Sequence, residues 1–430
     1  MAFQSKEWVY NFLGSRVVDL AVLKEATENN FLSKDFYNHI IQSLQRKKLH
    51  HRFISLQNFN EFAKTFSKAK PCWCLSGKKY IDCHFFKSNT AKTSDNELNS
   101  QQKKIFNEGQ CLHRHIDKCS SSTSIQSHSI SKRKSLSSIA KNNHVYGLKL
   151  EFRGKMSFKK MGLGQASTFA GFCEKHDNKL FESFEKNNFQ KSRKQLFDLC
   201  YRALCIEHYH MKSVFNFFQY MKQHIDNQED FDQQIERQIS INCLIKFYKI
   251  GIKNSNNHKS ELEKSFLEPK HEDHLTHYIF ELHKGYPAFL GCTCFNMEFD
   301  LCGNRLQNLG NLSDLPRNIF INCVSFDGQG FFILSWFNKN NEYGNKILNS
   351  ILKSKNSIED NLFSLCFLYV QNTYVSPSWY ENLTDFQKSD LEKMQMFWND
   401  DDKFSIHLIK PNLDSIKVKN HYFLTSTTYK

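Results

Sequence analysis

The sequence is poor in residues that interrupt regular structure and lacks long apolar runs. It holds 6 prolines and 16 glycines in 430 residues, and so few helix breakers favour a helix-rich fold with few long flexible linkers. No apolar run reaches about eighteen residues, which excludes a hydrophobic membrane-spanning helix. The N-terminal stretch MAFQSKEWVYNFLGSRVVDL carries charges throughout and lacks the apolar core of a secretory signal peptide. We therefore expect a cytoplasmic protein that does not cross a membrane.

Cysteine, in contrast, is abundant, with 14 residues. Thiols stay reduced in the cytoplasm, so we expect metal ligands or small core residues instead of disulfides. Cys200, Cys205 and Cys243 belong to helical segments with apolar stripes, and Cys292 and Cys294 share one face of an expected strand. We predict that these five pack in the core.

Positive charge exceeds negative charge by 14 at neutral pH. Such a surplus favours a polyanionic partner, DNA or RNA, although a genome rich in AT, which favours Lys, Asn and Phe codons, would produce the same bias. The chain also holds 40 phenylalanines and 16 tyrosines. Length and bulky apolar content together suffice for two or three domains with substantial cores.

The segment PCWCLSGKKYIDCHF, residues 71–85, concentrates metal-ligand chemistry. Its candidate ligands are Cys72, Cys74, Cys83 and His84. The intervening LSGK supplies a tight turn that brings the CxC pair to face the Cys-His pair around one tetrahedral zinc. Four protein ligands leave no open position, so we predict a structural zinc site.

This spacing, with Ser-Gly-Lys-Lys-Tyr between the ligand pairs, resembles the SEC-C zinc-binding motif. The resemblance covers about fifteen residues and implies a portable zinc module that docks proteins or nucleic acid. We also expect Lys78, Lys79 and Tyr80 to be presented on the surface of the module as contact residues.

A second candidate zinc site lies further along the chain. Its ligands would be Cys111, Cys119, Cys173 and His176. Cys173 and His176 stand three residues apart at a turn that enters a helix, as in zinc knuckles, whereas the first pair is spaced more widely than usual.

Residues 109–185 resemble, more loosely, the HNH endonucleases, which have a zinc-stabilised ββα-metal core. The resemblance implies that His128 deprotonates a water molecule and that Asp177 or Asn178 helps to hold a divalent cation, Mg²⁺ or Mn²⁺, beside the scissile phosphate. Ser127 stands where HNH enzymes carry an acidic residue or a histidine, which weakens the expected cation site. The middle asparagine of the motif has two candidates, Asn142 and Asn143.

Periodicity organises the rest of the chain. Apolar residues recur every three or four positions through residues 186–251, as in two long packed helices. Short β-like runs follow a hydrophilic boundary at residues 252–274. The Asp327-Gly328 pair between two such runs predicts a β-hairpin.

We predict a multi-domain α+β protein that ends in an antiparallel sheet with helices. The expected segments are a helical region 1–70, a SEC-C-like module 71–86, an HNH-like segment 109–185, a helical hairpin 186–251 and an α+β domain 275–430.

Two functions fit this pattern. The first is a zinc-containing, nucleic-acid-binding protein with HNH-like, metal-dependent nuclease activity, which by resemblance would act in bacterial defence or mobile-element biology. The alternative is a non-catalytic interaction protein in which zinc only holds loops and the SEC-C-like module docks a protein partner.

Overall fold

A computed structural model describes most of the chain. The described residues are 17–48, 53–113, 119, 124–150, 156–266, 268, 270–285, 287–309, 314–396 and 415–424. The start of the predicted helical region, residues 1–16, therefore lies outside the described residues. The chain forms two compact units: unit 1 comprises residues 1–106 and 211–253, and unit 2 comprises residues 107–210 and 254–430.

Unit 1 is built from short elements around an aromatic core. They are β1 (Val17–Asp19), α2 (Leu20–Glu28), α3 (Lys34–Arg46), β2 (Phe53–Ser55), α4 (Leu56–Lys64), η1 (Lys87–Asn89) and most of α5 (Asp95–Asn107). Phe36, Phe59 and Trp73 are completely buried in this core, where they meet Ile235 and Ile239. Residues 71–86 thus pack into unit 1 through Trp73.

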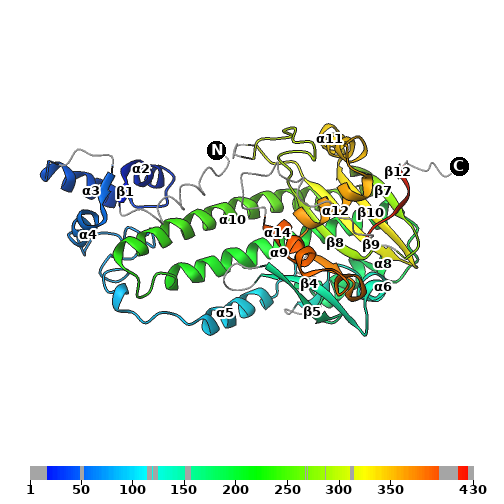
Figure 1. Cartoon of the computed structure of the whole chain (residues 1–430), viewed down its shortest axis with the longest axis horizontal. Coiled ribbons are helices and arrows are strands. Elements are labelled where there is room, and N and C mark those ends of the chain that lie inside the picture. Colours follow the sequence, from blue (N-terminus) through cyan, green and yellow to red (C-terminus); the bar gives the residue numbers. More distant parts are fainter. Residues whose placement is uncertain are drawn as a thin grey trace. The chain divides into compact units, whose positions relative to one another are not determined.

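Two long helices, α9 (Arg193–His224) and α10 (Phe231–Ser265), are present as the apolar periodicity predicts. Residues 252–265, predicted as a hydrophilic boundary, instead continue α10, because a polar composition does not by itself end a helix. The two helices run side by side, drawn in green (Figure 1). Within unit 1 the rings of Phe218 and Tyr248 meet at 5.4 Å, and within unit 2 His208 Nδ1 lies 2.8 Å from Ser255 Oγ. The boundary between the two units falls inside both helices.

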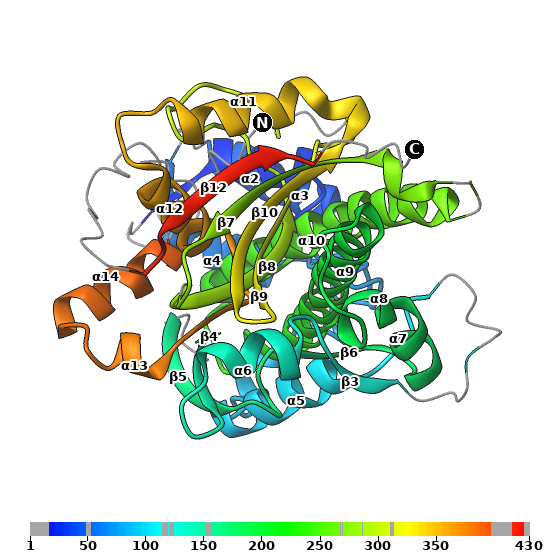
Figure 2. The ribbon, with the colours of Figure 1, turned by 90° about the vertical axis from the view of Figure 1, so that its right-hand side faces the viewer.

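Unit 2 contains an eight-stranded, fully antiparallel sheet (Figure 2) with the order β12-β7-β10-β9-β8-β11-β4-β5. Its strands are β4 (His144–Leu150), β5 (Met156–Gly162), β7 (Leu275–Leu282), β8 (Phe289–Phe295), β9 (Ile319–Phe326), β10 (Gln329–Phe337), β11 (Thr373–Val375) and β12 (Val418–Phe423). The predicted α+β class with a C-terminal antiparallel sheet is confirmed. Strands β4 and β5, from the HNH-like segment, belong to this same sheet.

Helices cover both faces of the sheet. Alternate residues of β10 point to opposite sides: Phe332 and Leu334 pack in one cluster with α11 (Asn341–Leu352), α12 (Ile358–Tyr369) and α14 (Asp385–Met396). Phe331 and Ile333 pack in another cluster with the N-terminal part of α9. Cys292 and Cys294 are buried in β8, as predicted for core cysteines. Short helices η4 (His271–His274), η5 (Asn338–Asn340) and α13 (Pro377–Tyr380) connect these elements.

A second, two-stranded sheet in unit 2 carries the central candidate residues. Strand β3 (Ile125–His128) pairs antiparallel with β6 (Thr168–Phe172), and α7 (Glu174–Leu180) and α8 (Glu182–Glu185) follow. Strands β4 and β5, with η3 (Lys132–Leu136) and α6 (Ser137–Ile139), lie in the sequence between β3 and β6. The order strand, antiparallel strand, helix is that of the ββα-like centre expected from the sequence.

Among the residues that the structure describes, none of the helices combines the length and apolar character needed to span a bilayer.

Candidate metal centres

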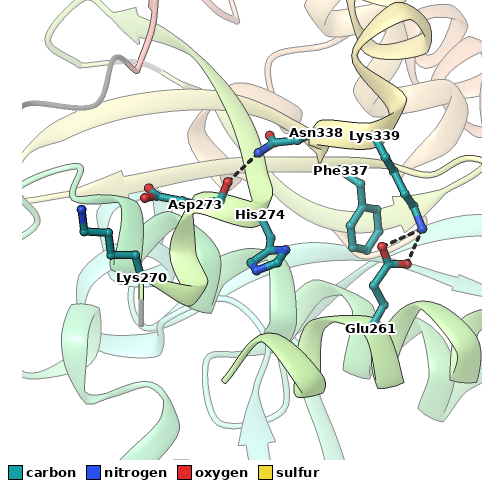
Figure 3. Close-up of a pocket in the computed structure, with 7 residues that line it drawn as sticks. All are labelled: Glu261, Lys270, Asp273, His274, Phe337, Asn338 and Lys339. Carbon is teal, nitrogen blue, oxygen red and sulfur yellow. Dashed lines mark hydrogen bonds and ion pairs between the residues drawn. The ribbon is translucent and has the colours of Figure 1, made fainter. Parts of the chain in front are cut away.

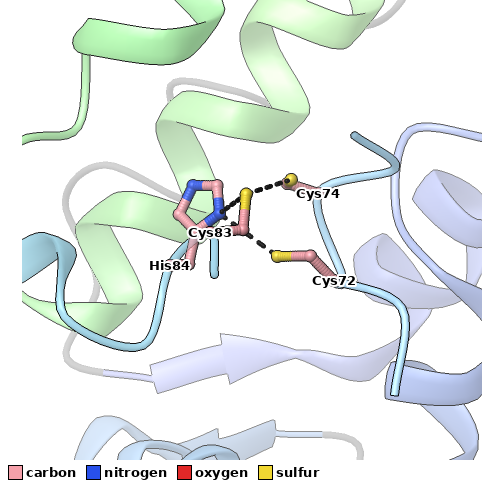
Figure 4. A group of neighbouring side chains, drawn as sticks. All are labelled: Cys72, Cys74, Cys83 and His84. Carbon is pink, nitrogen blue, oxygen red and sulfur yellow. Dashed lines mark hydrogen bonds between the residues drawn. The ribbon is translucent and has the colours of Figure 1, made fainter. Parts of the chain in front are cut away.

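The first Cys/His group forms at a tight loop in unit 1. Its ligand atoms, from Cys72, Cys74, Cys83 and His84, all lie within 4.8 Å of one another (Figure 4). Leu75 and Gly77 adopt φ values of 63° and 78°, in the left-handed region, so the loop can reverse direction between the two ligand pairs. A hydrogen bond of 2.8 Å from Cys72 N to Lys78 O closes the turn.

The donor set is that of a closed structural zinc site. His84 Nδ1 lies 3.1 Å from Cys83 Sγ and 3.2 Å from Cys72 Sγ, and Cys74 Sγ lies 3.6 Å from Cys83 Sγ. Three thiolates and one imidazole suit tetrahedral Zn²⁺ and provide all four ligands. Cys72, Cys74 and His84 are nearly fully buried, so the loop would hold the ion inside unit 1.

The expected surface of this loop is only partly exposed. Lys78 and Lys79 are exposed, but Tyr80 is 3% exposed, so its prediction as a contact residue is wrong. The ring of Tyr80 instead packs at 5.7 Å from those of Phe66 and Phe85. The aromatic side chain therefore anchors the loop in the core.

The second Cys/His group lies in unit 2, where the ligand atoms of Cys111, Cys119, Cys173 and His176 again fall within 4.8 Å of one another. His176 Nδ1 is 3.3 Å from Cys173 Sγ, 3.4 Å from Cys111 Sγ and 3.6 Å from Cys119 Sγ. Cys173 is the N-cap of α7 and His176 lies in its first turn, which places the two side chains together. The two groups are consistent with two structural zinc ions.

His128 lies at the end of β3 with one ring nitrogen engaged. Its Nε2 is 3.1 Å from the carbonyl oxygen of Leu163. Because a carbonyl only accepts, Nε2 carries the proton and Nδ1 presents its lone pair. Burial lowers the pKa of His128, and the charges of Lys132 and Arg202 lower it further, so the imidazole is neutral at pH 7.

Asp177 shares this environment, whereas Asn178 does not. Burial raises the pKa of Asp177, and the charge of Arg202 opposes that rise. Among the described residues, Asp177 Oδ1 and Ser127 Oγ are buried without a hydrogen-bond partner. Asn178 is exposed, since neighbouring helical residues point about 100° apart. Of the two alternatives from the sequence, Asp177 is the one that is partly buried and paired with Arg202.

Both candidates for the middle asparagine are exposed at the turn before β4, with φ values of 51° for Asn142 and 58° for Asn143. The backbone oxygen of Asn143 accepts a hydrogen bond of 3.0 Å from Leu163 N. Leu163 thus links Asn143 to His128 through its two backbone groups.

Sequence reasoning missed the buried Arg202, from α9. Its Nη1 lies 2.6 Å from Glu185 Oε1, and its Nη2 lies 3.8 Å from Asp177 Oδ1. The guanidinium also stacks 4.1 Å from the ring centre of Phe181. In the sequence Arg202 stands in an apolar helical stripe, and nothing local indicates that distant acidic residues surround it.

A pocket of about 440 Å³ lies elsewhere in unit 2 (Figure 3). Its lining residues are Glu261, Lys270, Asp273, His274, Phe337, Asn338 and Lys339. Lys339 is paired with Glu261 at 2.6 Å, and His274 with Glu268 at 2.7 Å. The pocket contains none of the residues predicted as catalytic or metal-binding.

Comparisons with protein-family models, curated proteins and solved structures find no match to this chain. The SEC-C and HNH resemblances therefore rest on local residues alone, and the function must be argued from the geometry of the sites.

Proposed function

We propose that the protein is a zinc-stabilised, nucleic-acid-binding protein whose β3, β6 and α7 form an HNH-like, metal-dependent phosphodiesterase site. The observation that supports this proposal most directly is the orientation and protonation of the His128 imidazole. Its Nε2–H is held by the Leu163 carbonyl, which leaves Nδ1 as the ring nitrogen that can accept a proton, and its lowered pKa favours the neutral ring. An oriented, neutral imidazole of this kind is suited to act as a general base.

In the proposed reaction His128 Nδ1 takes a proton from a water molecule as the water oxygen attacks phosphorus. The bond from phosphorus to one ester oxygen breaks, and that oxygen leaves with the electron pair and takes a proton from solvent. Asp177 would bind Mg²⁺ or Mn²⁺, which supplies charge stabilisation to the phosphate. A single protein carboxylate is the minimum for such an ion, since these cations are commonly held by one or two carboxylates together with phosphate oxygens and water.

Exposed positive charge beside His128 supports nucleic-acid binding. Lys132 and Arg133 are exposed in η3, and Lys132 is close enough to lower the pKa of His128. Cations at the rim of the site would meet the phosphate backbone on either side of the cleaved bond.

Cleavage of plasmid DNA and RNA in Mg²⁺ or Mn²⁺ tests the nuclease. We expect His128→Ala to abolish cleavage and Asp177→Asn to reduce it by at least about 100-fold, because general base and cation ligand each contribute on that scale. His274→Ala, an exposed histidine of the same unit, is the matched control and should leave cleavage unchanged. Activity that survives His128→Ala would refute the proposed mechanism.

Salt titration tests binding independently. Lys132→Gln with Arg133→Gln should lower the slope of log affinity against log salt by about 2, whereas the exposed pair Lys103→Gln with Lys104→Gln should not change it. Equal slopes for wild type and both double variants would contradict a phosphate contact at η3.

A non-catalytic role has one specific observation in its favour. Arg202 lies between Asp177 and Glu185, so both carboxylates take part in a buried ion network that can serve stability alone. In this second candidate the zinc sites hold loops and the surfaces dock a partner. Absence of cleavage by wild type with both cations, combined with two tightly bound zinc ions, would favour it.

We also propose a cytoplasmic location, because all 14 cysteines are free thiols in the structure, as expected for a reducing compartment.

A further inference from the structure

The ring nitrogen of His84 that points away from the thiols contacts a carboxylate that is distant in the sequence. His84 Nε2 lies 2.7 Å from Asp226 Oδ2, and both side chains are buried in unit 1. Because a carboxylate accepts, His84 Nε2 carries the proton and Nδ1 is left to face the sulfur atoms of Cys72 and Cys83. Asp226 therefore selects the tautomer in which Nδ1 can bind a metal.

Asp226 is itself held rigidly. It lies in the connection between α9 and α10, is 0% exposed, accepts a hydrogen bond of 2.9 Å from Gln238 Nε2 and forms an ion pair with Lys87. The group that meets His84 is therefore a carboxylate with a fixed direction.

We propose that Asp226 is a positioning residue of the first zinc site, which orients His84 and strengthens it as a zinc ligand. Metal-bound histidines commonly donate their second N–H to such a carboxylate, and loss of that partner weakens metal binding by about 10–100-fold. The inference rests on the proposed binding of zinc at Cys72, Cys74, Cys83 and His84.

The charges around the site support this assignment. Lys222 is half-buried and lies within electrostatic range of Cys72, Cys74 and Cys83. The two charges of Zn²⁺, together with Lys87 and Lys222, would balance three thiolates and the Asp226 carboxylate. A buried set of this kind is stable only when all its charges are compensated.

Further contacts tie the zinc loop to the same connection. Gln228 N donates to Lys87 O at 3.1 Å, and Asn227 Nδ2 donates to Ala91 O at 3.3 Å. From α10, Asn242 Nδ2 donates to Cys74 O at 3.3 Å. Zinc binding and the packing of this connection against the loop should therefore be one cooperative event.

Zinc release to a chromophoric chelator tests the assignment on the full-length protein loaded with zinc. We expect wild type to release two ions per chain and Asp226→Asn to release one of them about 10–100-fold faster. The second site, at Cys111, Cys119, Cys173 and His176, provides the internal reference, because its ion should leave at the wild-type rate.

The matched control is Asp82→Asn, which removes a carboxylate from an exposed position of the same loop. It should leave both release rates unchanged. Equal release rates in wild type, Asp226→Asn and Asp82→Asn would overturn the inference, while two zinc ions in wild type would leave the proposed zinc binding intact.

A double-variant cycle separates positioning from general support of the fold. In a His84→Cys background the fourth ligand has no N–H to orient, so Asp226→Asn should no longer accelerate release. Equal acceleration in both backgrounds would refute the positioning role.

If Asp226→Asn does not fold, Gln238→Met provides the test. This variant removes one hydrogen bond to Asp226 and should accelerate release of the same ion by a few-fold. An unchanged release rate would refute the inference.

Discussion

Arg202 is a buried charged residue of unit 2 that contacts side chains from other helices or their connections. It is 2% exposed, pairs with Glu185 and Asp177, and stacks on Phe181. A buried ion pair is not by itself strongly stabilising, but removal of one partner leaves the other charge uncompensated in the interior.

We therefore expect Arg202→Met to lower the free energy of unfolding by about 3–5 kcal/mol. Methionine keeps much of the apolar length that packs on Phe181. The lowered free energy of unfolding would therefore mainly reflect the carboxylates of Glu185 and Asp177, which lose their positively charged partner. Urea denaturation of the zinc-loaded protein measures it.

The control for this prediction is Arg237→Met. Arg237 lies 3.8 Å from Glu229 with its side chain 47% exposed, and a pair of this kind contributes at most about 1 kcal/mol. Similar losses for the two variants would contradict a special role for Arg202.

Glu207 should make the stability of the folded protein depend on pH. Its Oε1 accepts a hydrogen bond of 2.6 Å from Thr293 Oγ1, and burial raises its pKa from 4.5 to about 7. Between these values the folded state binds more protons than the unfolded state, so the contribution of Glu207 to stability is fully present below pH 4.5 and is lost as the pH rises through 7.

We expect the stability of wild type relative to Glu207→Gln to fall by about 2 kcal/mol between about pH 5.5 and about pH 8. Glutamine keeps the acceptor for Thr293 but does not titrate, and the subtraction cancels the pH dependence of the metal sites. Chemical denaturation of both proteins at the two pH values measures the difference. A difference independent of pH would show that Glu207 is not buried as a titrating group.

Residue spacing predicted both Cys/His sets that the structure brings together, because each set contains at least one close pair whose chemistry is specific. It could not predict Asp226, which lies 142 positions after His84, or Arg202, whose acidic partners come from other helices. Such long-range contacts depend on how elements pack, and local periodicity carries no information on that packing.

At the scale of the element, the hairpin of β9 and β10 follows directly from two residues. Phe326 pairs with Gln329, and between them Asp327 and Gly328 adopt φ values of 51° and 80°. Two left-handed residues give the turn whose twist matches the strands, so the predicted hairpin is confirmed.

Gly328→Ala should destabilise the protein by about 1–2 kcal/mol, because a Cβ disfavours the left-handed region. Gly162→Ala is the matched control, since φ at Gly162 is not in that region and no atom lies within 4 Å of an added Cβ. Thermal unfolding compares the two. An equal or larger loss at Gly162 would contradict the conformational explanation.

For other elements the sequence predicts the type, helix or strand, but not the exact bounds or the partner strands. The predicted α+β domain, residues 275–430, contains helices α11 and α12 beside its strands. Strands β4 and β5, however, join a sheet whose other strands lie more than a hundred residues further along the chain. The choice of partner strand depends on the tertiary fold, on which the local sequence carries little information.

At the scale of the whole molecule, each unit contains one Cys/His group: Cys72, Cys74, Cys83 and His84 in unit 1, and Cys111, Cys119, Cys173 and His176 in unit 2. Structural zinc contributes directly to folding free energy. Loss of one ion should therefore act first on the unit that holds it.

We expect Cys74→Ser to increase amide hydrogen exchange in the described parts of residues 17–106 and in residues 211–253, while β7 to β10 of the large sheet stay protected. Cys173→Ser should instead increase exchange in β3, β6 and α7, with the loop at residues 71–86 unchanged. Mass spectrometry of peptides from the two zinc-loaded variants would locate each effect. Because α9 and α10 contribute residues to both units, their exchange would show how far each loss spreads. Identical exchange maps for the two variants would mean that the units unfold as one, and would contradict independent stabilisation by two zinc ions.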